Sequence, residues 1–445
     1  MNRPAFLTLR NSHGFRRGPH RPGQNAAFRV RGVEGWRGVA ALGIVVVHAW
    51  QLMDTDGDGQ GPGSPGVVLG MNSFDLLVDL FFVLSGLLLF LPFAAAAVGG
   101  SGRAVDGDDF LWRRVLRFLP TYWLLVLICW SFKNYGVTTA DWLDLVEHIT
   151  LTHAFDSDRI FNTIGPAWTL SVEWVFYLTL AVCAPAWSRW ARQAPTEAAR
   201  AGRLLWPLLP VLAASLLYKL NVDFVWDVPL EEWAWRFGPA AKADIFAIGM
   251  ALAVVMVLLK ERGLPSPVCL VALVGGVWML WEARVTTILA PETVLESLRH
   301  TVSALGWALV LLSVMAARTP LAARAVDNAL TMRLSVLAYT IYIVHEPVGL
   351  GLEHLGLISV EGSGFLLNVL LMGSLSIFAA WVLHRVWEEP WADVGALRAK
   401  GGGRKDLYAD LEMPPLEGED GPHGLRDRIH HATGRARSSV EVMTR

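Results

Sequence analysis

The sequence predicts an all-α membrane protein with about ten transmembrane helices. Hydrophobic residues make up 53% of the chain and charged residues only 18%. Apolar segments of bilayer length also recur along most of the 445 residues. Soluble domains of this size are rarely so apolar. The formal net charge of −2 gives no indication of a nucleic-acid partner, and we expect none.

The apolar segments divide the chain into three parts. We expect residues 1–30, which are polar and rich in Arg, Gly and Pro, to be disordered. Residues 31–390 form the membrane domain, and residues 391–445 are a polar cytosolic tail. The segment 141–155 is too interrupted by charge to span, so we expect it to be interfacial or re-entrant. The expected spans lie near residues 36–53, 74–98, 118–135, 165–187, 204–221, 239–259, 267–282, 298–316, 333–353 and 364–387.

The distribution of basic residues predicts the orientation of these spans. Arg residues precede the first span, follow the second and fourth, and separate the eighth from the ninth, whereas the alternate loops are mostly acidic. Under the positive-inside rule both termini are cytosolic, which agrees with an even number of spans. We therefore expect a multi-pass protein of the cytoplasmic (inner) membrane, with the lipid bilayer as its surroundings.

The first span carries two ionisable side chains, Arg37 at its start and His48 deep inside it. They are eleven residues apart, which on an α-helix is about 16 Å of rise and nearly a whole number of turns. Ionisable groups inside a bilayer are costly and indicate function. A neutral imidazole can take a proton from an attacking hydroxyl, so His48 is our candidate general base. The alternative is a His packed against a neighbouring helix.

Two carboxylates, Asp79 and Glu173, also fall inside expected spans. Each must pair or face a polar cavity, because exposure to lipid would be costly. Either could orient His48, and either could equally serve a structural hydrogen bond.

A basic group, Arg113, Arg114 and Arg117, lies at the predicted cytosolic surface. Arg side chains suit phosphate or pyrophosphate geometry, but topology alone also collects basic residues on this side. Ser85 and the glycine that follows it allow close helix packing or line a narrow channel. Tyr122 is explained most simply as an interface aromatic residue.

His345 precedes Pro347, which we expect to break the helix, and suggests a polar opening at the outer end of that span. A structural hydrogen bond explains this His equally well. We expect no metal: His148 and His153 have the wrong spacing for one helical face. The loop at residues 54–66 begins like a calcium-binding loop but has Pro65 where the bidentate Glu belongs.

Three classes of function fit these residues. An enzyme would use His48 with the basic surface group. A proton-coupled secondary transporter, or a glycan or lipid exporter, would use Arg37, His48, Asp79 and Glu173 as a relay, but no inverted repeat or paired broken helix indicates one. A membrane scaffold would have little reason to keep so many buried ionisable groups.

Five blocks of the chain resemble acyltransferase family 3, a family of integral-membrane O-acyltransferases. The resemblance extends from Glu34 to about Pro390, and the departures include Glu34 and Trp36 for the usual Asp and Leu, and Ala338 for the usual Ser. The late Glu-Arg-Pro of the family is Glu-Glu-Pro here. The matching blocks are Glu34 to Gly38 with the downstream His48, residues 79–87, Arg113 to Trp123, residues 168–177 and residues 338–347.

The resemblance implies transfer of an acyl group, usually acetyl, from acyl-CoA to a hydroxyl of a sugar, glycolipid, glycan or secondary metabolite. It implies that the donor meets basic residues at the cytosolic face, that Arg37 helps to hold it and that His48 is the essential base. We therefore expect catalytic roles for His48, Arg37, Glu173 and Asp79, donor binding by Arg113, Arg114, Arg117, Tyr122 and Ser85, and substrate binding by Trp168, Ser171 and His345.

Overall fold

The computed structural model describes residues 7–8, 29–30, 32–55, 61–99, 105–259, 262–289, 293–318 and 321–391. These residues belong to one compact unit, Met1–Asp410, and a second unit, Leu411–Arg445, lies outside them. The predicted disordered N-terminus and cytosolic tail thus fall outside the described part. The exception is a short antiparallel pair, β1 (Leu7–Thr8) with β2 (Arg29–Val30).

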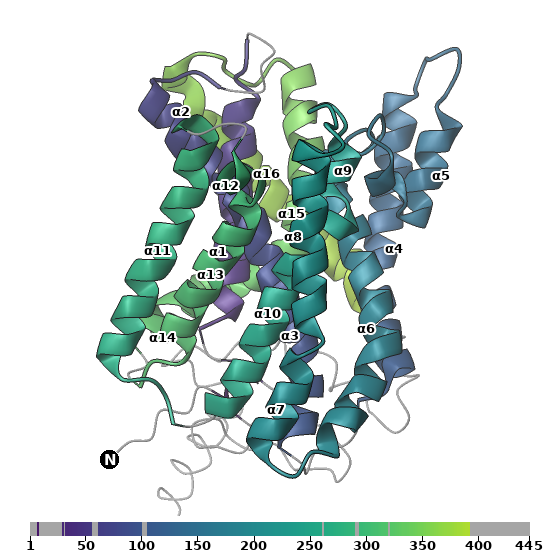
Figure 1. Cartoon of the computed structure of the whole chain (residues 1–445). Coiled ribbons are helices and arrows are strands. Elements are labelled where there is room, and N and C mark those ends of the chain that lie inside the picture. The colour runs from purple at the N-terminus through teal and green to yellow at the C-terminus, as the bar shows by residue number, and fades with distance from the viewer. Residues whose placement is uncertain are drawn as a thin grey trace, which may run out of the picture. The chain divides into compact units, whose positions relative to one another are not determined.

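Ten long helices in the described part alternate in direction between two ends (Figure 1). Figure 1 shows α2 (Pro65–Asn72), α5 (Trp142–Thr150), α9 (Trp233–Phe237) and α12 (Val294–Ser297) at one end, which we call the α5 end. The opposite, α7 end holds α7 (Glu197–Leu205) and α14 (Leu321–Val326). The long helices are α1 (Glu34–Gln51), α3 (Leu76–Val98), α4 (Gly107–Lys133), α6 (Trp168–Arg192), α8 (Leu208–Phe224), α10 (Pro239–Leu259), α11 (Ser266–Leu289), α13 (Arg299–Met315), α15 (Ala329–His354) and α16 (Phe365–Leu383).

Eight helical segments of the described part are long and apolar enough to cross a membrane. The two other predicted spans correspond to α1 and α13. Helix α13 is apolar but has only 17 residues, and α1 includes Glu34, Arg37 and His48, which lower its mean hydropathy. The all-α, multi-pass architecture is therefore confirmed, whereas the orientation of the termini stays a prediction.

The third span differs from its prediction. It was expected to begin near residue 118, but α4 begins at Gly107, so Arg113, Arg114 and Arg117 lie on helical turns and not in a loop. The side chain of Asp106 accepts hydrogen bonds from the backbone N–H groups of residues 108 and 109 and caps this polar first turn. Apolar content marks the part of a helix that meets lipid, and this helix continues beyond that part.

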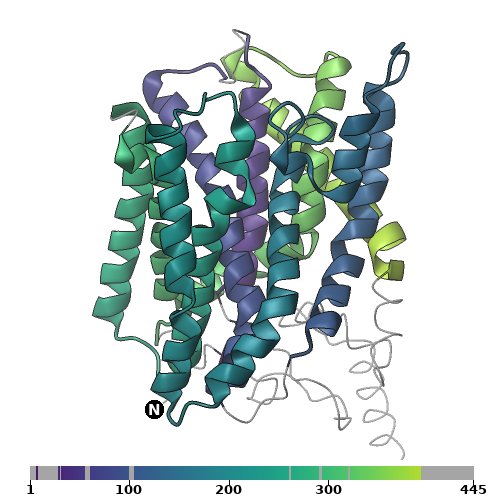
Figure 2. The same cartoon turned by 45° about the vertical axis from the view of Figure 1, so that its right-hand side comes forward.

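Helices α1 and α3 stand in the middle of the bundle, as the purple ribbons in Figure 2 show. Helix α1 packs along α15, and Gly38 makes this approach possible, because a Cβ added there would lie 2.7 Å from the carbonyl oxygen of Thr331. Only a residue without a side chain permits such close packing of two backbones. The site depends on this pair of helices.

Candidate active site

Two histidines from distant parts of the chain meet between α1 and α15. Nδ1 of His48, in the last turn of α1, lies 2.8 Å from Nε2 of His345. The two ring centroids are 4.7 Å apart, and His345 is fully buried. The sequence singled out each histidine separately, and the structure brings them together.

The surroundings of this pair assign the protons on both rings. Nδ1 of His345 lies 3.3 Å from the carbonyl oxygen of Ile341, which can only accept a hydrogen bond, so this nitrogen carries a proton. Nε2 of His345 is then the acceptor, and Nδ1–H of His48 donates to it. The remaining nitrogen of His48, Nε2, keeps its lone pair and has no hydrogen-bond partner in the described part of the chain.

The prediction that Pro347 breaks its helix is wrong, because α15 continues to His354 with this proline inside it. A proline in a membrane helix removes one backbone hydrogen bond, and packing against neighbouring helices makes that loss tolerable. The residue before it, Glu346, accepts a hydrogen bond of 2.5 Å from the backbone N–H of Gly165. One turn of α15 therefore holds both His345 and the segment that leads into α6.

Glu173 and Ser85 join α6 to α3. The Ser85 hydroxyl donates to Oε1 of Glu173 at 2.5 Å, and the Tyr177 hydroxyl donates to its other oxygen. Both carboxylate oxygens are therefore engaged within the protein. The contact connects two residues that the sequence had assigned to different tasks, and their catalytic and donor-binding roles stay predictions.

A cationic group forms where α1 and α4 begin, near the α7 end. Arg37 on α1 and Arg114 on α4 lie close enough to Arg117 for their charges to repel its charge. Glu34 and Tyr177 lie close enough to interact with Arg117 as well. Arg113 and Arg117 are exposed, and the guanidinium of Arg114 lies 5.9 Å above the Phe110 ring. Like charges gathered at a surface favour an anionic ligand.

Asp79 has a partner that the sequence analysis missed. Its carboxylate lies 3.0 Å from Nδ1 of His300 on α13, and Asp79 is 1% exposed. No hydrogen bond in the described part joins it to His48. Nearby, the buried ammonium of Lys242 lies over the rings of Trp168 and Phe237 at 5.8 and 5.1 Å. His300 and Lys242 are both ionisable residues inside predicted spans, and this feature of the sequence is sufficient to single them out.

Polar side chains also gather at the α5 end, between α5 and α6. Nδ1 of His148 lies 3.1 Å from Asp144, and the His148 ring stacks on that of His153 with centroids 4.0 Å apart. The sequence missed this contact because Leu151, with φ +58°, reverses the chain between the two rings. His153 in turn hydrogen-bonds Ser171, and the Tyr122 hydroxyl donates to the carbonyl oxygen of His148.

Two side chains of this polar group, His153 and Asp144, have pKa values that differ from their ordinary ones. Burial lowers the pKa of His153 to about 3. Burial alone would raise the pKa of Asp144, but hydrogen bonds from His148 and Thr163 outweigh it and hold the pKa below its ordinary value. Tyr122, Ser171 and Trp168 are thus engaged in packing and hydrogen bonds, and their ligand-binding roles stay predictions.

Comparison with known proteins identifies what the chain is similar to. A family model described as an acyltransferase domain matches residues 30–385. Acyltransferase MdmB from Streptomyces mycarofaciens is 27% identical over 394 residues, which cover 81% of this chain and 91% of that protein. No solved structure matches the chain. Within the described residues, no group of three or more His, Cys, Asp and Glu side chains could hold a metal ion.

Proposed function

The chain belongs to the acyltransferase family whose model spans residues 30–385, and we propose on this basis that it is a membrane O-acyltransferase with His48 as its general base. The donor is acyl-CoA, most simply acetyl-CoA, and the acceptor is a hydroxyl of a carbohydrate, glycolipid, glycan or secondary metabolite. The family favours an enzyme over the transporter or exporter alternative. The hydrogen bond between His48 and His345 is the observation that carries the proposal.

In this proposal His48 carries out the proton transfers, and His345 holds its ring in place through one hydrogen bond. Nε2 of His48 takes the proton of the acceptor hydroxyl, while its Nδ1–H stays bonded to His345. The acceptor oxygen attacks the thioester carbonyl, and the carbon–sulfur bond breaks. The coenzyme A thiolate then leaves with the proton that His48 carries, so the base returns to its starting form.

Donor binding is proposed at the cationic group formed by Arg37, Arg114 and Arg117 together with the exposed Arg113. Guanidinium groups bind phosphate oxygens with two parallel hydrogen bonds, and coenzyme A presents several phosphates. The predicted orientation puts this group on the cytosolic side of the inner membrane, where acyl-CoA is available. Arg37 and His48 lie on the same helix, so the donor would extend along α1 from the α7 end toward the histidine pair.

Transfer of label from acetyl-CoA in membranes that contain the protein tests this proposal. We would offer a panel of hydroxylated acceptors and compare wild type with His48→Ala at equal expression. His354→Ala is the matched control, because this His lies at the exposed end of α15. We expect His48→Ala to lower transfer by about 10²–10⁴-fold and the control to have no effect. Equal transfer by wild type and His48→Ala would exclude His48 as the base.

A further inference from the structure

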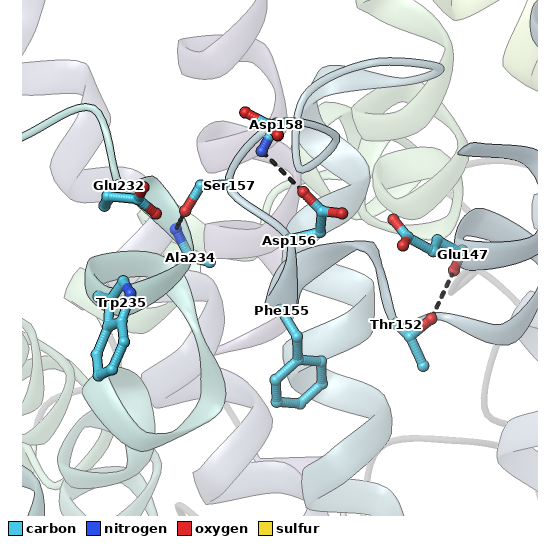
Figure 3. Close-up of a pocket in the computed structure, with 9 residues that line it drawn as sticks. All are labelled: Glu147, Thr152, Phe155, Asp156, Ser157, Asp158, Glu232, Ala234 and Trp235. Atoms are coloured by element: carbon cyan, nitrogen blue, oxygen red, sulfur yellow. Dashed lines mark hydrogen bonds between the residues drawn. The ribbon is translucent and has the colours of Figure 1, made fainter. Parts of the chain in front are cut away.

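The α5 end contains a pocket that the proposed chemistry does not use (Figure 3). It has a volume of about 430 Å³ and lies between the turn after α5 and the start of α9. The hydroxyl of Ser157 accepts a hydrogen bond of 3.2 Å from the backbone N–H of Ala234, which joins the two walls. This volume is within the range of pockets that bind small organic molecules.

Four carboxylates line this pocket, and none of the described residues that line it is a Lys or an Arg. Asp156 pairs with Arg159 at 2.9 Å, but Arg159 also pairs with Asp141 outside the pocket. No ion pair in the described part of the chain neutralises Glu147, Asp158 or Glu232. The four carboxylates are those of Glu147, Asp156, Asp158 and Glu232.

Glu147 lies close enough to Asp156 for the charges of the two carboxylates to repel each other. One of its carboxylate oxygens is buried and has no hydrogen-bond partner in the described part. Burial, and then the neighbouring charge of Asp156, raise the pKa of Glu147. A bound cation would relieve the repulsion between these two carboxylates, and its N–H groups could donate to the buried oxygen of Glu147.

Two aromatic rings complete the lining, and they favour an organic ammonium group over a metal ion as the bound cation. Phe155 is 60% exposed and Trp235 is 42% exposed, and both line the pocket. Aromatic faces attract organic ammonium groups and stack on the apolar faces of sugar rings. A metal ion would instead require several carboxylate oxygens at one point. The combination therefore favours an amine on a hydroxylated carbon skeleton.

We propose that this pocket binds an acceptor that carries a protonated amino group beside its hydroxyls. This inference rests on the proposed acyltransferase function and deepens it, because it names the class of acceptor and the end of the bundle from which that acceptor arrives. The donor would approach from the α7 end and the amine-bearing acceptor from the α5 end.

A continuous stretch of chain connects the pocket to the histidine pair. Phe155 lines the pocket, and His153 in the same turn hydrogen-bonds Ser171 of α6. Further along the same stretch, Gly165 is bound by Glu346, the neighbour of His345. A molecule held at the pocket thus lies against the segment that leads into the proposed catalytic site.

Equilibrium binding to the purified full-length protein tests the proposal without any acyl transfer. We would use titration calorimetry in detergent at neutral pH with two probes, diglucosamine and N,N′-diacetylchitobiose. They share one disaccharide skeleton, and only the first carries amines. We expect diglucosamine to bind at least about tenfold more tightly, with an affinity that falls as salt is added.

The variants separate pocket charge from total charge. Asp158→Asn with Glu232→Gln removes two pocket carboxylates, whereas Asp227→Asn with Glu231→Gln removes two exposed carboxylates that do not line the pocket. The first pair should weaken diglucosamine binding by about tenfold, and the second should leave it unchanged. Equal loss in both pairs would show that only overall charge matters and would overturn the proposal.

Other outcomes distinguish this inference from the proposed function. Absence of amine preference, together with His48-dependent acyl transfer to a neutral acceptor, would overturn the inference alone. Amine binding that requires Asp158 and Glu232, without transfer to any acceptor, would support the pocket and count against the enzyme mechanism. Binding of calcium alone by wild type, lost in the pocket variant, would overturn the amine assignment in favour of a metal site.

Discussion

Replacement of His345 by Phe gives the most direct test of the histidine pair. The substitution retains a buried ring of similar size but removes the nitrogen that accepts the hydrogen bond from Nδ1–H of His48. That N–H lies in a partly buried position, so its loss of a partner costs about 1–3 kcal/mol. His48 would also lose the contact that fixes its tautomer and the direction of its free nitrogen.

The expected loss of activity follows from that energy. If the hydrogen bond is maintained into the transition state, kcat for acyl transfer falls by about 10–100-fold. The KM for acyl-CoA should change little, because the cationic group around Arg117 is at the other end of α1. His354→Phe, at the exposed end of the same helix, should keep kcat within about twofold of wild type.

A double-mutant cycle decides whether the two histidines act as one unit. His345→Phe should have no further effect in a protein that already carries His48→Ala, because the positioning role of His345 is exerted through His48. Multiplication of the two losses would show that the residues act independently. Full kcat in His345→Phe would refute the tautomer argument itself.

Two further predictions concern stability. Since the pKa of buried His153 is about 3, the unfolded state binds the extra proton below pH about 6.5, and stability falls by about 2 kcal/mol on acidification to pH about 5. His153→Gln should flatten this dependence in thermal unfolding in detergent, and an unchanged pH profile would contradict the burial argument. Gly38→Ala should destabilise the protein by about 1–3 kcal/mol, because the new Cβ would meet the Thr331 carbonyl oxygen at 2.7 Å. Gly202→Ala, which has open space around it, is the control and should be neutral or slightly stabilising, so equal melting temperatures for the two variants would refute the close-packing argument.

The sequence predicted the helices well because a membrane imposes a length and a polarity on each one. The expected span at 239–259 coincides with α10, and the other expected spans overlap long helices in the same order. The errors occur where helices continue beyond lipid, as at the polar start of α4, or where Pro347 is tolerated inside α15. Hydropathy measures the apolar part of a helix and contains no information about its polar turns.

The candidate site was predicted only residue by residue. His48 and His345 each stood out as an ionisable group in an apolar segment, but 297 positions separate them and no periodicity relates them. Asp79 was identified without its partner His300, and three of the four carboxylates of the α5-end pocket lie in loops that carry no regular pattern.

The sequence by itself therefore determined the fold class and the family motifs, and it singled out several of the ionisable side chains inside the helices. Local composition is sufficient for these features, because lipid requires each spanning helix to be apolar. An ionisable residue inside such a helix is therefore easy to recognise in the sequence. Only the tertiary structure decided which side chains meet. The close approach of α1 to α15 at Gly38 pairs the histidines, and the reversed turn at Leu151 stacks His148 on His153. Both contacts depend on helix packing and chain reversal, which no single segment encodes.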